Sequence, residues 1–508
     1  MSKQYFKALY LDDYPTVHSK KTFAIAFNES EFELYSAVAP MSTYDILQLI
    51  KCDSYGDIKK CAEKDNRSIN NYVKLLIKNN IKCSNENVFQ KKDVTFSNSK
   101  SIPFQRWYPY LEGYSPRFVT NLIDKYCENS SLIYEPFAGT GTTIFSADNN
   151  NIKSVYSEVN PLLRFLIKVK LHILGMLMDE RLLLANELFV IRNEIFEHIK
   201  HISPSVRLDE AYKNTFGDSA YFPEEQYVLV LKIKTYIESL YSSNKNDLAD
   251  LLTIATFACL LPISYLKKQG DVRFKTEKER QNEQKLLQDI LPIKIDEIAE
   301  DISNMFYASK FDHNLLCDNA KEVGKYMLNE KISDVITSPP YLNGTNYFRN
   351  TKLELWFIGK LSSKDDLRKY RDETLTSGIN DVKKSYQNEI NNFNSELYDN
   401  TILQLQEKAY DSRIPLMAKC YFSEMAKVFD GLTIHLKDNA NVLIDLGDSI
   451  FSNVHIKTDY ILVEILKEYG YSLKDRIVLR QRRSQSGDLL TQVLLVMKYN
   501  KYDYMRNK

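Results

Sequence analysis

The chain has 508 residues, of which 67 are Lys or Arg and 67 are Asp or Glu, so its formal net charge is zero. At roughly 100–200 residues per domain, this length suits two to four domains, or one large domain with insertions. A hydrophobic fraction of 44% and a charged fraction of 26% exclude an intrinsically disordered chain. Zero net charge also excludes a uniformly basic nucleic-acid coat, but it is compatible with a local basic cleft.

The first hundred residues are lysine-rich. Residues 42–80 have helical spacing in short pieces, which favours a small helical appendage over a helix-turn-helix-like unit. Residues 85–101 are polar and turn-rich, as in a linker. We therefore expect an accessory segment over residues 1–100, which is a candidate for DNA binding.

Short apolar runs then alternate with helical patterns. Strands are predicted at 131–136, 154–159, 313–318, 333–338 and 441–446. Residues 160–304 carry apolar positions at helical spacing, with separate patterns at 224–242, 247–266 and 276–304. This block is too long for one crossover, so it predicts a helical insertion over 161–310.

The C-terminal part repeats the strand–helix alternation. A polar helical stretch covers about 362–412, and further helices are expected at 414–430 and 456–469. Two strand-like runs then follow without a helix between them. The prediction is an α/β fold with a doubly wound, Rossmann-like sheet that ends in an antiparallel hairpin. This sheet would be built from residues 101–160 and 311–508, with a polar insert near 360–412.

Cysteine usage and hydropathy indicate a cytoplasmic protein. The seven cysteines, an odd number, include no CxxC pair, which disfavours a disulfide framework and a zinc ribbon. The N-terminus lacks the apolar core of a signal peptide. The most apolar stretch, from Leu251, falls short of the ~20 residues of a membrane span and is expected to be a buried helix. Neither a metal nor a membrane is expected.

The first motif is EPFAGTGTT, at the point where a strand ends and a helix begins. Gly139 and Gly141 carry no Cβ, so the backbone can turn sharply and approach a ligand closely. The helix N-terminus adds free N–H groups. No lysine follows the glycines as it would in a Walker loop, so a nucleoside fits better than a polyphosphate.

Acidic residues end the next two predicted strands. Glu158 stands where a carboxylate can accept hydrogen bonds from ribose hydroxyls, and Asp318 ends the third strand. In doubly wound sheets this edge is the ligand crevice. Each acid taken alone is equally consistent with a helix N-cap.

The second motif is TSPPY, again at a strand end. Two prolines fix φ and remove two N–H donors, which leaves the carbonyls of Ser338 and Pro339 free to accept from a ligand. Tyr341 offers a flat face for stacking. A planar amine fits between these groups, although a rigid loop with a core tyrosine is an equally simple explanation.

Together these residues resemble the amino-methyltransferases that act on DNA bases. The resemblance rests on FAGTGTT, TSPPY and YSPRFVTNLIDKY from Tyr114, and it covers about 114–160 and 312–498. It implies S-adenosylmethionine as cofactor, with Phe137, Gly139 and Gly141 at its methionine part, Glu158 at its ribose and Asp318 at its adenine. Glu135 replaces the aspartate that is usual at the start of the glycine motif.

The resemblance also implies the reaction. Ser338, Pro339, Pro340 and Tyr341 would form the pocket for a base displaced from the duplex. Transfer to its exocyclic amine would then be direct, and it would depend on positioning and electrostatics. SPPY is typical of N4-cytosine enzymes, whereas DPPY and NPPY are typical of N6-adenine enzymes. No cysteine follows a proline, as the nucleophile of a C5-cytosine enzyme does.

The implied partners are double-stranded DNA and a cognate restriction endonuclease. Recognition of the target sequence would come from the 161–310 insertion, the 360–412 insert, the N-terminal segment or a partner protein. Four arginines, Arg476, Arg480, Arg482 and Arg483, lie near the terminal hairpin and form either phosphate contacts or a solvated basic turn. Two other hypotheses remain: a methyltransferase of structured RNA and a non-catalytic nucleic-acid-binding subunit. The intact TSPPY motif argues against the latter.

Overall fold

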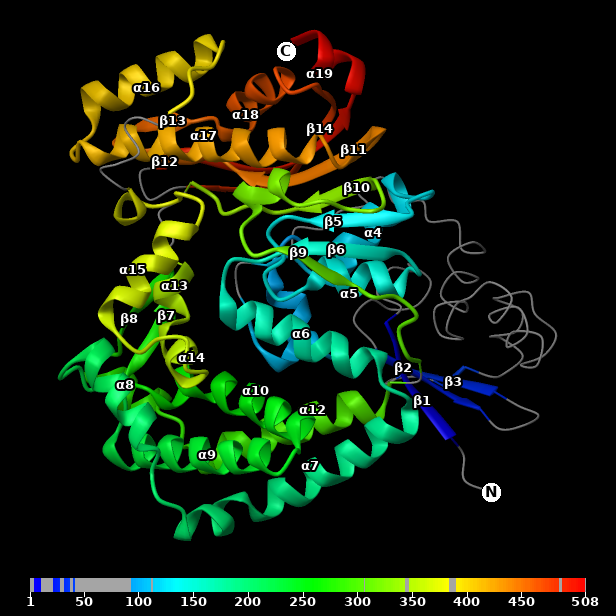
Figure 1. Cartoon of the computed structure of the whole chain (residues 1–508), viewed down its shortest axis with the longest axis vertical. Coiled ribbons are helices and arrows are strands. Elements are labelled where there is room, and N and C mark those ends of the chain that lie inside the picture. The colour runs from blue at the N-terminus through cyan, green and yellow to red at the C-terminus, as the bar shows by residue number, and fades with distance from the viewer. Residues whose placement is uncertain are drawn as a thin grey trace.

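The computed structural model describes residues 93–110, 113–305, 307–342, 347–382, 390–483 and 487–507, together with four strands in the first 41 residues (Figure 1). These strands form a small antiparallel sheet in the order β1-β2-β3-β4. Their bounds are Gln4–Tyr10, Thr22–Phe27, Phe32–Ser36 and Pro40–Met41. The helices predicted within 42–80 lie outside the described residues.

A seven-stranded sheet forms the centre of the fold, in the order β14-β15-β11-β10-β5-β6-β9. The five strands from β11 to β9 are parallel, and β15 is antiparallel to both of its neighbours. This is the Rossmann-like sheet with a terminal antiparallel hairpin that the sequence predicts, so the fold class is confirmed. The strands are β5 (Leu132–Glu135), β6 (Lys153–Ser157), β9 (Asn314–Cys317), β10 (Ile332–Thr337), β11 (Leu436–Gly447), β14 (Tyr471–Arg483) and β15 (Leu489–Tyr499).

Helices cover both faces of this sheet, which is why its strands are apolar on both sides. Ile133 and Ile336 pack in one cluster with residues of α4 (Pro116–Tyr126). Tyr134 and Val335, each next in sequence to one of these isoleucines, pack in another cluster with α17 (Arg413–Leu432) and α18 (Thr458–Lys467). The alternation follows the pleat, because successive side chains point to opposite faces.

Residues 161–303 build a separate helical layer with its own apolar core, below the sheet in Figure 1. At its centre lies α10, which by length and composition alone is apolar enough to cross a membrane, but 67% of its residues are buried inside the fold. The helices are α6 (Pro161–Gly175), α7 (Met178–His198), α8 (Val206–Phe216), α9 (Glu224–Ser242), α10 (Asn246–Ile263), α11 (Glu277–Glu283) and α12 (Leu287–Ser303).

This layer contains a hairpin that the sequence pattern does not predict. The strands β7 (Leu266–Gln269) and β8 (Asp271–Phe274) follow α10, so the predicted helix 247–266 ends at Ile263 and the predicted helix 276–304 is broken into α11 and α12. Gly270 occupies the turn with φ of +74°, a conformation that glycine adopts without strain.

The remaining elements connect these layers. After TSPPY come α13 (Tyr347–Asn350), α14 (Lys352–Phe357), α15 (Lys364–Glu373), α16 (Glu396–Lys408), and later β12 (Ser449–Phe451), β13 (Val454–Ile456) and α19 (Lys501–Asn507). Short 3-10 turns are η1 (Phe96–Ser101), η2 (Gln105–Trp107), η3 (Ile199–His201), η4 (Ala320–Lys325) and η5 (Ile379–Asp381). Strand β14 extends to Arg483, so the arginine cluster lies on a strand and is not the basic turn that the sequence also allowed.

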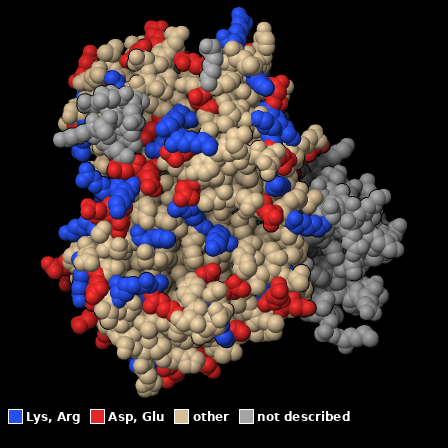
Figure 2. All heavy atoms as spheres, in the orientation of Figure 1, with Lys and Arg blue, Asp and Glu red and all other residues tan. Residues whose placement is uncertain are grey.

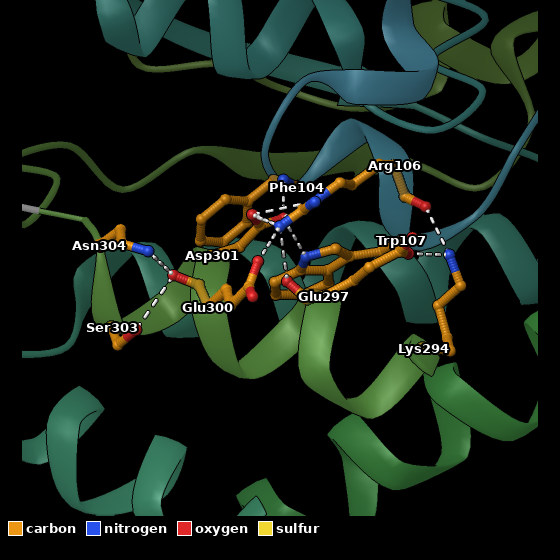
Figure 3. A network of polar contacts seen from close by, with 9 residues as sticks. All are labelled: Phe104, Arg106, Trp107, Lys294, Glu297, Glu300, Asp301, Ser303 and Asn304. Atoms are coloured by element: carbon orange, nitrogen blue, oxygen red, sulfur yellow. Dashed lines mark hydrogen bonds and ion pairs between the residues drawn. The ribbon is translucent and has the colours of Figure 1, made fainter. Parts of the chain in front are cut away.

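The segment 93–114, described except for residues 111 and 112, joins the helical layer to the sheet. Asp301 of α12 accepts hydrogen bonds from the backbone N–H of Phe104 at 2.9 Å and from the Trp107 indole N–H at 2.9 Å (Figure 3). Arg106 Nη2 pairs with the same carboxylate at 2.7 Å. Asp93, Val94, Phe96 and Ser99 are each at most 6% exposed, so these residues of the predicted linker are packed, whereas Ser101 is exposed.

Candidate active site

A cavity of about 310 Å³ opens at the carboxyl edge of the parallel strands, and both motifs line it. The predicted site residues that line this cavity are Phe137, Gly139, Glu158, Ser338, Pro339, Pro340 and Tyr341. Glu135, Gly141 and Asp318 lie outside its lining. The topology thus brings together side chains that come from three strand ends far apart in the sequence.

The glycine loop needs both of its glycines, for different reasons. Gly139 and Gly141 have φ of +56° and +89°, in the left-handed region. A Cβ on Gly141 would lie 3.1 Å from side-chain carbons of both Ile167 and Phe145, so Gly141 lets the loop pack on α6. At Gly139 the nearest atom would be Tyr110 Cε1, at 3.6 Å, and this glycine lines the cavity.

Glu158 is fixed at the tip of β6 by the backbone of the glycine loop. Its carboxylate accepts hydrogen bonds from Gly139 N at 2.7 Å and from Asn160 N at 2.8 Å. Burial raises its pKa to about 7, and these two hydrogen bonds oppose the rise. Each carboxylate oxygen can accept more than one hydrogen bond, so Glu158 retains the capacity to bind ligand hydroxyls in the cavity.

Glu135 lies beneath the loop and supports it from inside. Its carboxylate accepts hydrogen bonds from Tyr114 Oη, from Thr143 Oγ1 at 2.8 Å and from Phe137 N at 3.1 Å. Burial raises the pKa of Glu135 to about 7. These contacts join the segment 93–114, the glycine loop and α5 (Thr142–Asn149), so Glu135 acts on the cavity through Phe137 and Tyr114, which both line it.

Asp318, at the end of β9, does not line the cavity. Asp318 is exposed and forms an ion pair with Arg164 Nη1 at 2.6 Å. The next residues line the cavity instead: Asn319 Nδ2 donates to Glu373 O at 2.9 Å, and Lys321 Nζ donates to Thr374 O at 2.6 Å. These bonds hold a wall that the sequence analysis did not identify.

The TSPPY loop is held from below by a buried carboxyl group that the sequence analysis also missed. Asp445, at the end of β11, is 2% exposed and lines the cavity. Gln492 Nε2 donates to Asp445 Oδ1 at 2.8 Å and to Tyr341 Oη at 3.0 Å. Burial raises the pKa of Asp445 to about 7, while hydrogen bonds from Gln492, Tyr341 and Ser338 oppose the rise.

The ring of Tyr341 lies against the backbone of Gly447. A Cβ at Gly447 would lie 3.0 Å from Tyr341 Cδ2, a tight contact that the ring could relieve only by shifting a few tenths of an ångström. The sequence does contain a pattern that could have identified Asp445 and Gly447. Both lie in the run NVLIDLGD, which ends the next parallel strand at the same edge of the sheet.

The two ends of the cavity suit different chemistry. The end at Gly139 and Glu158 offers an uncrowded backbone and a carboxylate acceptor, whereas the other end offers proline-fixed carbonyls and an aromatic face. Such an arrangement can hold a nucleoside beside a planar amine. Among the described residues, no three His, Cys, Asp or Glu side chains are grouped to hold a metal ion.

Comparison with known proteins finds relatives along most of the chain. It is 26% identical over 427 residues to the Type II methyltransferase M.AvaI of Nostoc sp., covering 78% of this chain and 85% of that protein. The same values hold for M.AvaI of Anabaena variabilis. Type II methyltransferase M.BsoBI of Geobacillus stearothermophilus is 23% identical over 449 residues, with 78% and 84% covered. No family model matches the chain.

Proposed function

We propose that this chain is a Type II DNA methyltransferase that transfers a methyl group from S-adenosylmethionine to the exocyclic N4 amine of cytosine in double-stranded DNA. The observation that carries the proposal is the single cavity that the glycine loop, Glu158 and the TSPPY loop line together. The similarity to Type II methyltransferases over 78% of the chain supports it. Its biological role would be to protect DNA from a cognate restriction endonuclease.

The residues at the glycine end fit the cofactor. S-adenosylmethionine supplies an electrophilic methyl group when bound. Glu158 would accept the ribose hydroxyls, and the lack of a Cβ at Gly139 leaves room for the ligand against the loop. Phe137 would contact the methionine part. Because Asp318 is paired with Arg164, the adenine contact is better assigned to the neighbouring Asn319, which lines the cavity.

The TSPPY end would hold the displaced base. The Pro339 carbonyl and Ser338 Oγ would accept from its exocyclic amine, and this orients the nitrogen lone pair toward the methyl group. Tyr341 would stack on the ring. Asp445 would act as a positioning residue, since its carboxylate accepts hydrogen bonds from Ser338 and Tyr341. Transfer would be direct, without a covalent intermediate on the protein: the amine nitrogen would bond to the methyl carbon as the carbon–sulfur bond of the cofactor breaks, S-adenosylhomocysteine would leave, and the methylated amine would lose one proton to solvent.

Serine at the first position of the SPPY sequence favours cytosine as the target base. Ser338 carries neither the carboxylate nor the carboxamide of the DPPY and NPPY motifs, which are typical of adenine enzymes. The alternative product is N6-methyladenine. Finding this product would change the target base but leave the rest of the proposal standing.

Labelled cofactor tests the proposal directly. Purified protein would be incubated with tritium-labelled S-adenosylmethionine and, separately, with unmethylated plasmid DNA and with structured RNA. We expect label in DNA alone, and mass spectrometry of the digested DNA should give N4-methylcytosine. Tyr341→Ala serves as the inactive control. Label in RNA alone, or no transfer to either, would refute the proposal.

A further inference from the structure

The four arginines of β14 have different environments. Arg476 Nε donates to Asp459 at 2.6 Å, and its guanidinium lies 4.7 Å from the centre of the Tyr460 ring. Arg483 Nη1 donates to Gly487 O at 2.8 Å. Arg480 and Arg482 are exposed, they line the cavity, and neither guanidinium has a hydrogen bond or an ion pair with the part of the chain that the structure describes.

Arg480 and Arg482 lie on the same face of β14. Successive side chains of a strand alternate between its faces, so Arg480 and Arg482 share one face. In the β14–β15 ladder, Arg480 is opposite Gln492, and in the β11–β15 ladder Gln492 is opposite Gly447. Gln492 in turn binds Tyr341 and Asp445. Arg480 and Arg482 therefore lie on β14, next to the strand β15 whose Gln492 holds Tyr341 and Asp445.

Two carboxylates that line the cavity with these arginines are already engaged. Asp448 lines the cavity, but it accepts from Thr491 N at 2.7 Å and pairs with His455 Nε2 at 2.7 Å. Asp445 is buried below the rim. Basic and acidic side chains are interspersed over the face drawn in Figure 2, and the net charge is zero, so attraction of an anion has to be local.

We propose that Arg480 and Arg482 bind backbone phosphates of double-stranded DNA beside the nucleotide whose base enters the TSPPY pocket. The inference rests on the proposed function and deepens it. A base displaced from the duplex brings its own sugar and phosphates to the pocket rim. Guanidinium groups bind phosphate oxygens in bidentate fashion, and such contacts fix the position of the strand without reading its sequence.

The test compares Arg480→Gln, Arg482→Gln and the double variant with Lys474→Gln. Lys474 is an exposed cation on the same strand that does not line the cavity, so this control removes one charge without touching the rim. Affinity for a fluorescent unmethylated DNA duplex would be measured by anisotropy at several salt concentrations. Calorimetry would measure affinity for S-adenosylmethionine, and thermal melting would check folding.

Each rim variant should weaken DNA binding roughly 10- to 100-fold, as expected for loss of a charge-assisted hydrogen bond of ~1.5–3 kcal/mol. The slope of log affinity against log salt should fall by about 0.9 for each arginine removed. Affinity for S-adenosylmethionine and the melting temperature should not change, and Lys474→Gln should bind DNA like the wild type. Arg480→Lys should recover part of the lost affinity because it keeps the charge.

Two results would overturn the inference: unchanged DNA affinity and salt slope in the double variant, or an equal loss of DNA affinity in Lys474→Gln. Because binding is measured without turnover, these results are independent of whether methyl transfer is found. A wild-type protein that binds DNA through this rim but transfers no methyl group would refute the proposed function and leave the phosphate site standing.

Discussion

Replacing Asp301 with alanine would release the segment 93–114 from the helical layer. The Asp301 side chain is 2% exposed and is the shared acceptor for Phe104 N, Trp107 Nε1 and Arg106. Its loss leaves two buried N–H groups unsatisfied and a half-buried guanidinium without its main partner. Among the described residues, the Arg106 guanidinium would keep Glu300 at 3.3 Å and the Glu297 carbonyl at 3.2 Å.

These contacts determine how much unfolding free energy Asp301→Ala should lose. Removing one partner of a buried ion pair costs about 3–5 kcal/mol of unfolding free energy. An unsatisfied buried donor costs about 1–3 kcal/mol, but water can reach this site beside Arg106, so we do not add these terms in full. We expect Asp301→Ala to lower the unfolding free energy by about 3–5 kcal/mol. Cofactor affinity should also fall, because the same segment supplies Tyr110 and Tyr114 to the cavity wall.

Urea unfolding followed by circular dichroism would measure the stability, and calorimetry would measure binding of S-adenosylmethionine. The matched control is Asp296→Ala on the same helix. Asp296 pairs with Arg192 Nη2 at 2.9 Å, and the two side chains are 28% and 42% exposed. An exposed pair of this kind contributes about 0–1 kcal/mol. Equal losses in the two variants, or a loss below about 1 kcal/mol for Asp301→Ala, would refute the reasoning.

Three further outcomes are expected. Glu158→Ala should weaken binding of S-adenosylmethionine roughly 10- to 100-fold by calorimetry, since hydrogen bonds to a charged acceptor contribute ~1.5–3 kcal/mol; unchanged affinity would remove Glu158 from the cofactor site. Gly447→Ala should crowd the Tyr341 ring and lower transfer in the labelled-cofactor assay while cofactor affinity is kept; Tyr341→Ala should abolish transfer, and an unfolded Tyr341→Ala protein would instead indicate a purely structural tyrosine. Burial raises the pKa of Asp445 to about 7, from a value near 4 in the unfolded chain. Between these two pH values the folded state binds more protons than the unfolded state, so the stability that Asp445 contributes is lost as pH rises. Urea unfolding at pH 5 and pH 8 should therefore give a smaller pH dependence for Asp445→Asn than for the wild type, and an identical dependence would contradict this account.

Local patterns in the sequence were sufficient to predict the central sheet and the two motifs. A strand that is buried on both faces is a short apolar run, and a strand–helix turn that requires positive φ carries glycine, as at Gly139 and Gly141. Prolines in TSPPY likewise restrict their own backbone. These properties depend on a few neighbouring residues, so the sequence predicts the sheet, its terminal hairpin and the presence of Glu158 and Tyr341 at strand ends.

Only the tertiary structure decided which polar groups meet. The separation between Gln492 and Tyr341 is 151 residues, and that between Arg106 and Asp301 is 195. Such contacts depend on strand order and register, which a single sequence does not specify. For the same reason the sequence placed Asp318 in the cofactor site, whereas Arg164 of α6 holds it outside the cavity. It also left four arginines equivalent, and the pleat and pairing of β14 then directed Arg480 and Arg482 to the cavity rim.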